Sequence, residues 1–404
     1  MKWEKAKLGE LYEVHNGLSK ARKFFGEGYP FLTFSTVFNN YFIPKQITDL
    51  VQSTEKEQES YSIRRGDVFV TRTSETSDEL GMSCVALKDY PMATYNGFTK
   101  RMRPITNRVF PEYIGYYMRL PSFRGEFRAF STMTTRASLR NEDLLGLEVK
   151  LPSIEIQKQI ADILSAYDDL IENNQKQIKL LEEAAQRLYK EWFVNLRFPG
   201  HENTKIVDGV PEGWNWCKLE DAIQLDPKVT LTKERMKQFV PMSALSTSSM
   251  VLDESQFTET TSNSGSKFQN GDTLLARITP CLENGKTAYV SGLKSDEGAV
   301  GSTEYIVMRA KTINSYMVYL LARTDDFRQS AINSMSGSDG RQRVKSDKLK
   351  MLDYLHPTSE LVEKFKNVEE PIFEKIYRLS KQMQQAKQAR DLLLPKLMSG
   401  EVEV

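Results

Sequence analysis

The stretch that decides the fold is LPSIEIQKQIADILSAYDDLIENNQKQIKLLEEAAQRLYKEWFV, residues 151–194. It contains no glycine, and no proline after Pro152. Apolar residues recur in it at alternating steps of four and three, interrupted by one polar residue, Asn174. A seven-residue repeat keeps one face of a helix turned toward a second long helix. We therefore predict a helix over 154–194 that packs on another helix, with Asn174 fixing their register.

The length of this helix indicates a spacer. A helix of about forty residues is roughly 60 Å long, which is too long for the interior of one ordinary domain. The chain has 404 residues, enough for two or three globular units. We expect one globular recognition domain at each end of the helix.

The sequence before the helix is repeated after it. Residues 65–68 (RGDV) correspond to 270–273 (NGDT), and Arg72 corresponds to Arg277, at a constant offset of 205 positions. An ordered series of matches at one offset indicates an internal repeat. The repeat includes the helix, because residues 358–397 carry a second near-heptad pattern.

The heptad positions of the two helices form the predicted helix–helix seam. Two long helices with single-sided seams pack most simply on each other, as an antiparallel pair. Pro371 has no counterpart in the first helix and should kink or restart the second. The predicted seam residues are Ile160, Leu164, Tyr167, Ile171, Asn174, Ile178, Leu181 and Leu188 in the first helix, and Phe365, Val368, Ile372, Leu379, Met383 and Leu393 in the second.

The segments outside the helices mix strand and short-helix signals. Residues 67–72 follow a glycine turn and are rich in β-branched and aromatic residues, which is typical of a strand. Residues 111–120 begin with proline and carry apolar residues on one face, which indicates a short helix. The fold class that we predict is two mixed α/β (α+β) globular domains in tandem repeat, separated by two long antiparallel helices.

Composition excludes several classes of protein. The chain has 55 Lys and Arg against 54 Asp and Glu, so any surface that binds nucleic acid must be local. Its three cysteines and three histidines are scattered, which argues against a metal site and suits a reducing compartment. No stretch approaches eighteen apolar residues, and the N-terminus lacks a signal core. We expect a soluble cytoplasmic protein with no metal and no membrane contact.

Motifs for catalysis are missing from the sequence. There is no G-x-x-x-x-G-K-[ST] for a P-loop and no G-x-G-x-x-G for a dinucleotide. There is also no Pro-Pro dipeptide, which an amino-methyltransferase motif requires. We predict that the chain has no catalytic residues of its own.

Polar loops at matching places of the repeat hold the candidate DNA-binding residues. Ser and Thr hydroxyls suit phosphates, and Arg suits guanine edges. For any single arginine, a solvated surface loop is an equally good interpretation. The candidates are Arg72, Thr73, Ser74, Arg101, Arg103, Thr135, Arg136 and Arg140 in the first half, and Arg277, Thr279, Arg341, Arg343 and Lys345 in the second.

Four motifs together resemble the specificity subunit of a type I restriction–modification system, over nearly the whole chain. They are TRASL (135–139), LPSIEIQ (151–157) leading into the first helix, VPEGW (210–214) and LPKLMSGE (394–401). The start of the second helix departs from the pattern, because it lacks a glutamine at the place that matches Gln157.

The resemblance implies target recognition domains that each read one half of a split site in double-stranded DNA, with the helices fixing the spacer between the halves. Because the two domains share little outside their anchors, the half-sites should differ. The implied parts are the first recognition domain (1–151), the first spacer helix (152–195), a linker (196–213), the second recognition domain (214–356) and the second spacer helix (357–404).

The resemblance also implies partners. Two modification subunits would dock on the chain and supply adenine-N6 DNA methylation with S-adenosylmethionine. Restriction subunits would add ATP- and Mg-dependent translocation and endonuclease cleavage. The chain itself would bind no cofactor.

Two other functions stay open at this point. The near-neutral charge also suits a coiled-coil scaffold or adaptor whose globular domains bind proteins rather than DNA. A methyltransferase activity of the chain itself has the least support. Selection from a random DNA pool tests the first alternative, and binding of S-adenosylmethionine tests the second.

Overall fold

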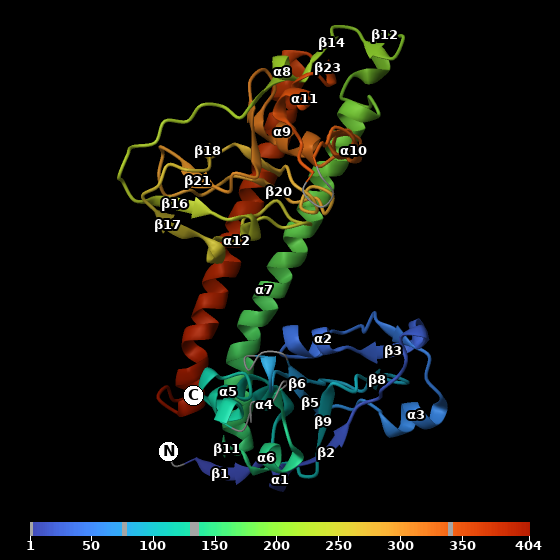
Figure 1. Ribbon diagram of the computed structural model, residues 1–404, viewed down its shortest axis with the longest axis vertical. Helices are drawn as coiled ribbons and strands as arrows, with labels where there is room; N and C mark the ends of the chain where they lie inside the picture. The colour runs from blue at the N-terminus through green and yellow to red at the C-terminus, as the bar shows by residue number, and fades with distance from the viewer. Residues whose placement is uncertain (1–2, 75–78, 130–136, 338–341) are drawn as a thin grey trace. The chain divides into compact units, whose positions relative to one another are not determined.

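The computed structural model describes residues 3–74, 79–129, 137–337 and 342–404 (Figure 1). Contacts divide the chain into unit 1, which is Met1–Asp169 with Ala386–Val404, and unit 2, which is Leu170–Gln385. Two long helices, α7 (Ile154–Tyr189) and α12 (Ser359–Ser399), each contribute to both units.

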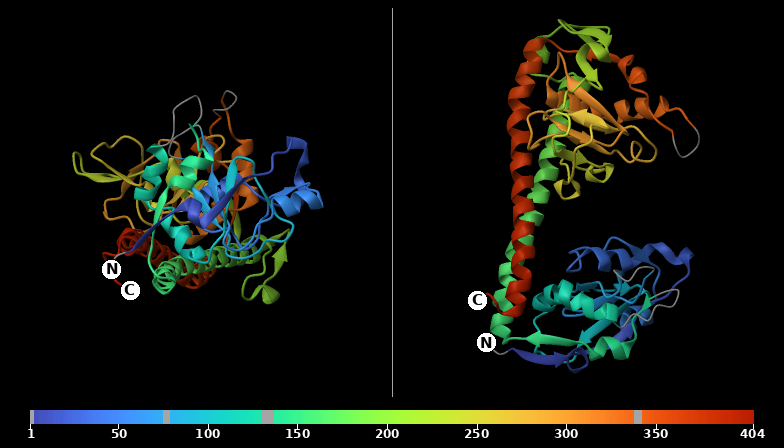
Figure 2. Two further views of the ribbon diagram at one scale, coloured as in Figure 1. Left: turned by 90° about the horizontal axis from the view of Figure 1, so that it is seen from below. Right: turned by 60° about the vertical axis from the view of Figure 1, so that its left-hand side comes forward.

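Helices α7 and α12 pack along their apolar faces and lie side by side in every view (Figures 1 and 2). In unit 1, Ile160 and Leu164 of α7 share a core with Leu394 and Leu397 of α12. In unit 2, the later turns of α7 share a core with the earlier turns of α12. The pair is therefore antiparallel, as the two seams predict, and α7 ends in a π-helical turn, Lys190–Val194.

The predicted restart of the second helix at Pro371 is wrong, because α12 is continuous. Pro371 and Asn367, whose carbonyl would have accepted the missing N–H, are both exposed, so this carbonyl is open to solvent and the helix continues past the proline. Val368, which the heptad pattern places in the seam, is 42% exposed, whereas Glu369 is fully buried. The helix period of 3.6 turns the fourth residue after Phe365 inward rather than the third.

Unit 1 contains a four-stranded and a three-stranded sheet. The first has the order β2 (Tyr12–Asn16), β9 (Thr99–Pro104), β5 (Val68–Thr71), β7 (Ser83–Val85). The second has the order β4 (Leu50–Val51), β3 (Phe25–Leu32), β8 (Thr94–Tyr95). Two strand pairs complete it, β1 (Glu4–Lys7) with β11 (Glu148–Leu151) and β6 (Thr73–Ser74) with β10 (Ala137–Ser138). Its short helices are α1 (Leu8–Leu11), α2 (Phe34–Asn39), α3 (Glu55–Ser60), α4 (Pro111–Tyr117), α5 (Pro121–Ala129) and α6 (Asn141–Gly146).

Unit 2 repeats this plan with two four-stranded sheets. The first has the order β15 (Ile223–Leu225), β22 (Tyr305–Ala310), β19 (Thr273–Ala276), β20 (Thr287–Tyr289). The second has the order β17 (Thr258–Thr260), β16 (Lys237–Val240), β21 (Ala299–Gly301), β18 (Ser266–Phe268). Its strand pairs are β14 (Asn215–Lys218) with β23 (Asp353–His356) and β12 (Ile206–Val207) with β13 (Val210–Pro211). Its short helices are α8 (Leu219–Ala222), α9 (Ser315–Ala322), α10 (Asp325–Asn333) and α11 (Ser346–Lys350).

The internal repeat is visible in the strand order, since β2, β9, β5 and β7 correspond one by one to β15, β22, β19 and β20. The turn before each central strand is also shared. Gly66 and Gly271 both have φ +89°, a left-handed conformation that favours glycine. The predicted fold class, mixed α/β domains in tandem with a long helix pair, is confirmed.

Candidate nucleic-acid interface

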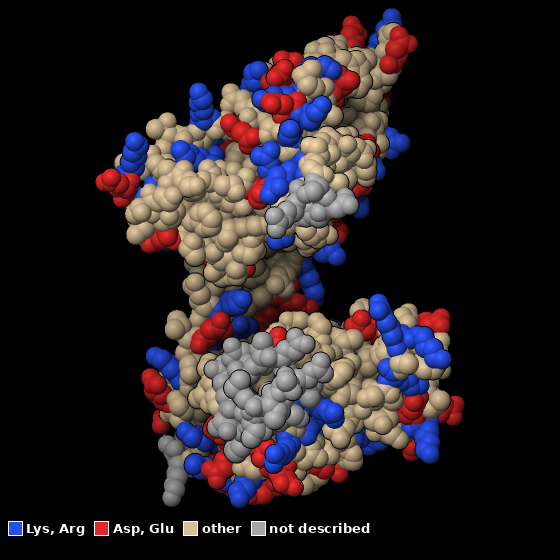
Figure 3. Space-filling view, in the orientation of Figure 1, with Lys and Arg blue, Asp and Glu red and all other residues tan. Residues whose placement is uncertain are grey.

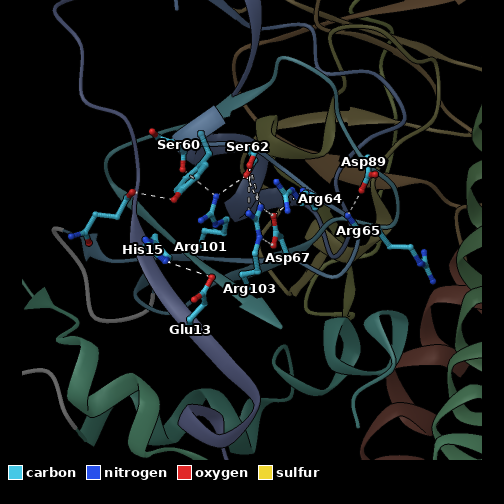
Figure 4. A network of polar contacts seen from close by, with 12 residues as sticks. Glu13, His15, Ser60, Ser62, Arg64, Arg65, Asp67, Asp89, Arg101 and Arg103 are labelled. Carbon is cyan, nitrogen blue, oxygen red and sulfur yellow. Dashed lines mark hydrogen bonds and ion pairs between the residues drawn. The ribbon is translucent and has the colours of Figure 1, made fainter. Parts of the chain in front are cut away.

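Two of the predicted DNA-binding arginines take part in a polar network inside unit 1 (Figure 4). Arg101 and Arg103 lie on one face of β9, two residues apart. Arg103 donates from Nε and Nη2 to the two carboxylate oxygens of Asp67, at 2.8 and 2.6 Å. Arg101 is only 3% exposed and donates to the main-chain oxygen of Ser62 at 2.8 Å. Both guanidinium groups are therefore engaged within the fold.

Unit 2 contains the same ion pair at the matching place. Arg309 of β22 donates to both oxygens of Asp272 at 2.7 Å, and Asp272 is 1% exposed. Both aspartates also accept a main-chain N–H three residues before them, from Arg64 and Gln269, at 2.8 Å. Comparison of the two repeats could have found this pair, because the Asp and the Arg are matched in both.

Arg72, at the end of β5, lies beside a cation that sequence reasoning left out of the site. Its Nη1 donates to Asn16 Oδ1 at 3.2 Å. Lys100 is 5% exposed, and its Nζ donates to Asn141 Oδ1. Burial, and then the charge of Arg72, lower the pKa of Lys100, and Asp143 opposes them. Neither cation forms a salt bridge among the described residues. Arg72 is half-buried and suits an anion such as a DNA phosphate, whereas the Lys100 ammonium group is buried and donates to Asn141.

In unit 2, the arginine that corresponds to Arg72 makes different contacts. Arg277 donates from Nε and Nη2 to the main-chain oxygen of Val344, at 3.0 and 2.8 Å. Arg343 pairs with Glu304 at 2.8 Å. Hydrogen bonds from Arg343 lower the pKa of that carboxyl group, which keeps the pair charged. The Thr279 hydroxyl donates to Glu283 at 2.8 Å.

A hollow of about 430 Å³ lies next to Arg277. Lys228 and Lys267 line it together with Arg277, and Asp226 is the acidic residue in its wall. The carboxylate oxygens of Asp226 already accept hydrogen bonds, one from the Val307 N–H at 3.0 Å and one from the Ser346 hydroxyl. The hollow therefore has a surplus of positive charge.

Arg140 and Lys345 are the predicted residues that both units present in the same way. They are 205 positions apart, and each is the N-cap residue of a short helix, α6 or α11. Both are exposed, and neither side chain forms a hydrogen bond or salt bridge in the part of the chain that the structure describes.

The remaining predicted residues are placed only in part. Thr73 and Ser74 form β6, which pairs with β10. Thr135, Arg136 and Arg341 lie outside the described residues.

The visible surface of each unit mixes Lys and Arg with Asp and Glu (Figure 3). On this visible face, positive charge is therefore not spread over the whole of either unit. Among the described residues, no three His, Cys, Asp or Glu are arranged to hold a metal ion. None of the described helices has the length and apolar character needed to cross a membrane.

Comparison with known proteins shows which family the chain resembles. Residues 1–183 match the family model of the type I restriction modification DNA specificity domain. The type I restriction enzyme MjaIX specificity subunit of Methanocaldococcus jannaschii is 26% identical over 415 residues, which cover 100% of this chain and 94% of that protein. Along its whole length the chain is similar to the specificity subunits of type I restriction–modification systems.

Other specificity subunits support the assignment. The HindI specificity subunit of Haemophilus influenzae is 21% identical, with 99% of both chains covered. The crystal structure of the S subunit from M. genitalium has the same fold, with a TM-score of 0.58, 14% identity and 98% of this chain covered. The predicted resemblance is confirmed by the match of residues 1–183 to the DNA specificity domain and by the full-length similarity to known specificity subunits.

Proposed function

We propose that this chain is a specificity subunit that reads a double-stranded DNA site made of two unlike half-sites, one through each unit, with α7 and α12 fixing the spacer between them. The proposal rests on one observation: an exposed cationic residue stands at the matching position of both units. Arg140 and Lys345 occupy matching helix caps on matching sheets, beside the clusters around Arg72 and Arg277.

The chemistry around these residues supports unlike half-sites. In unit 1, Arg72 and Lys100 face neutral amides. In unit 2, Glu304 balances Arg343, whereas Thr99 and Ser138 stand at the corresponding positions of unit 1. Surfaces that differ in charge and hydrogen-bond donors select different bases.

The proposed division of the chain follows from this reading. Residues 1–151 and 214–356 are the recognition domains, 152–195 and 357–404 are the spacer helices, and 196–213 is the linker. Two modification subunits dock on the helices and supply methylation with S-adenosylmethionine. Restriction subunits, which use ATP and Mg, complete the complex.

Selection from a random DNA pool tests the proposal. We expect the full chain with its modification subunits to enrich a bipartite, asymmetric motif, and methylome sequencing of a host that carries the system to report the same motif. A pool without an enriched motif would overturn the proposal and favour a scaffold that binds proteins.

Single substitutions locate each half-site. Arg140→Ala should weaken the first half-site only, and Lys345→Ala the second only. Arg72→Ala should relax one base position by ~1–3 kcal/mol if it reads guanine, or lower the salt slope by about one if it binds a phosphate. Arg235→Ala, which removes an exposed residue paired with Glu297, is the control. If Arg140→Ala weakened both half-sites equally, its assignment to one of them would be wrong.

A further inference from the structure

A cluster of charged and aromatic side chains fastens the globular part of unit 1 to its two helices. We call Tyr41, Tyr116, Arg119, Asp168 and Arg390 the Asp168 cluster. Asp168 of α7 accepts a hydrogen bond from Arg390 of α12 and another from the Tyr116 hydroxyl of α4, at 2.5 Å. Three segments of the chain thus meet at one carboxylate.

Tyr41 extends the cluster into the domain. Its ring lies between the guanidinium groups of Arg390 and Arg119, each 5.3 Å from the ring centroid, and 5.5 Å from the ring of Tyr116. Arg119 donates to the main-chain oxygens of Val37, Phe38, Asn40 and Ser83. A continuous set of contacts therefore leads from the helices to the loops and to β7.

The buried charges of the Asp168 cluster favour a single arrangement of its side chains. Arg390 is 9% exposed, and it also donates to Asp391 at 3.0 and 2.8 Å. Loss of one partner would leave the other charge buried and uncompensated. A planar guanidinium group also fixes the direction of its contacts, unlike an ammonium group.

Unit 2 is attached to the same two helices by different chemistry. At the positions that match Arg390 and Asp168, it has Ala185 and Phe373. The Phe373 ring packs on Tyr289 and Tyr316, with centroids 5.1 and 4.7 Å apart. At this one place, unit 2 therefore has an aromatic contact where unit 1 has an ion pair, although Lys381 of α12 forms a salt bridge with Glu254 elsewhere in unit 2.

We propose that the Asp168 cluster is a specificity-determining device, which sets how the first recognition domain sits on the helices and so the spacer length at which the first half-site is accepted. The inference rests on the proposed bipartite function. Asp168 and Arg390 are positioning residues, because they act on the DNA site through the domain that they hold.

Spacer preference is the readout that tests this role. The full chain with its modification subunits is offered DNA with both selected half-sites and spacers of native length, one base pair shorter and one base pair longer. For Asp168→Asn and Arg390→Met, we expect the preference for the native spacer to fall by about tenfold, a change of ~1.4 kcal/mol, with both half-sites unchanged. Lys387→Met, on the exposed face of α12, should leave the preference intact.

Further variants separate positioning from stability. Arg390→Lys keeps the charge and should restore part of the preference. Tyr41→Leu removes the ring between the guanidinium groups but keeps the Asp168–Arg390 pair, so it should broaden the spacer profile with less loss of stability. Melting curves identify the variants that fold.

Two results would overturn the role of the Asp168 cluster and leave the proposed function standing. One is that folded variants keep the native spacer preference. The other is that they lose affinity equally at every spacer length, as a purely structural role predicts. If the native chain itself selected no bipartite site, the proposed function would fall with the inference, and that outcome is recognised before any variant is made.

Discussion

Single residues show where charge serves the fold and where it is free for a ligand. Asp67 with Arg103 and Asp272 with Arg309 are matched pairs in which the aspartate is buried. Arg140 and Lys345 are matched as well, but both are exposed. Repetition alone therefore does not single out a candidate DNA contact, because it also marks buried pairs; exposure and free donors are required as well.

The first prediction concerns the buried pair of unit 1. Arg103→Met leaves Asp67 buried and without its cation, so we expect the free energy of unfolding to fall by about 3–5 kcal/mol. Chemical denaturation followed by circular dichroism measures it. Lys5→Met removes an exposed pair with Glu148 and should cost less than about 1 kcal/mol. Equal losses in the two variants would contradict the structural role of Arg103.

Glu369 is a charged residue in an apolar place. Its side chain is fully buried, and its oxygens have no hydrogen-bond partner among the described residues. Burial raises the pKa of this carboxyl group from 4.5 to about 7. The folded chain then binds the proton more tightly than the unfolded chain, so the contribution to stability is complete below pH 4.5 and is lost as the pH rises to about 7.

The second prediction follows from this sign. Glu369→Gln removes the ionisation, so we expect the variant to be more stable than the native chain at pH 8, by ~3 kcal/mol, and nearly equal to it at pH 4. Denaturant titrations at the two pH values measure the difference. Glu363→Gln, on the exposed face of the same helix, is the control. If the native chain were equally stable at both pH values, compared with this control, the raised pKa of Glu369 would be contradicted.

At the scale of elements, the helix pair combines a heptad seam with a polar contact. Asn174 is 1% exposed and donates to Gln382 at 3.2 Å, within unit 2. A buried asparagine that is hydrogen-bonded across two helices favours one register over its neighbours, at some cost in stability. The contact fits the role in register that the sequence predicts for Asn174.

The third prediction tests the helices as a spacer. Insertion of one heptad into both α7 and α12, next to Asp169 and Ala386, keeps the seam in phase and lengthens the pair by ~10 Å. We expect the preferred DNA spacer to grow by up to about three base pairs, with the half-sites unchanged. Selection from a random pool measures both.

A matched insertion controls for length alone. Two extra residues in each helix rotate it by ~200° and turn the apolar faces away from each other, so that variant should lose stability instead of gaining a longer spacer. An unchanged spacer in the heptad variant would leave the helices as scaffolding only.

At the scale of the whole molecule, the chain repeats one plan with two sets of side chains. The strand order of the first sheet is the same in both units, whereas the residues at its edges and at the attachment to the helices differ. A duplicated framework with separate surfaces suits a protein that reads two unlike half-sites. Because the net charge is near zero, any affinity for DNA must come from a local group of cations.

The sequence by itself determined the helix pair, the repeat and the family resemblance. Each depends on order along the chain: the heptad period of 151–194, the offset of 205 positions and the short motifs next to the helices. Periodicity and repetition are local or linear properties, so they can be read without coordinates.

Only the tertiary structure decided which charged residues are buried. Arg103 depends on Asp67, Arg390 depends on Asp168, and Glu369 is enclosed by packing that no heptad register predicts. The buried charges of Arg103 and Arg390 are stable because a distant segment supplies a partner, whereas Glu369 has none and its pKa is raised instead. The sequence does not state which segments meet. For the same reason, Lys100 beside Arg72 entered the candidate site only when the strands were placed.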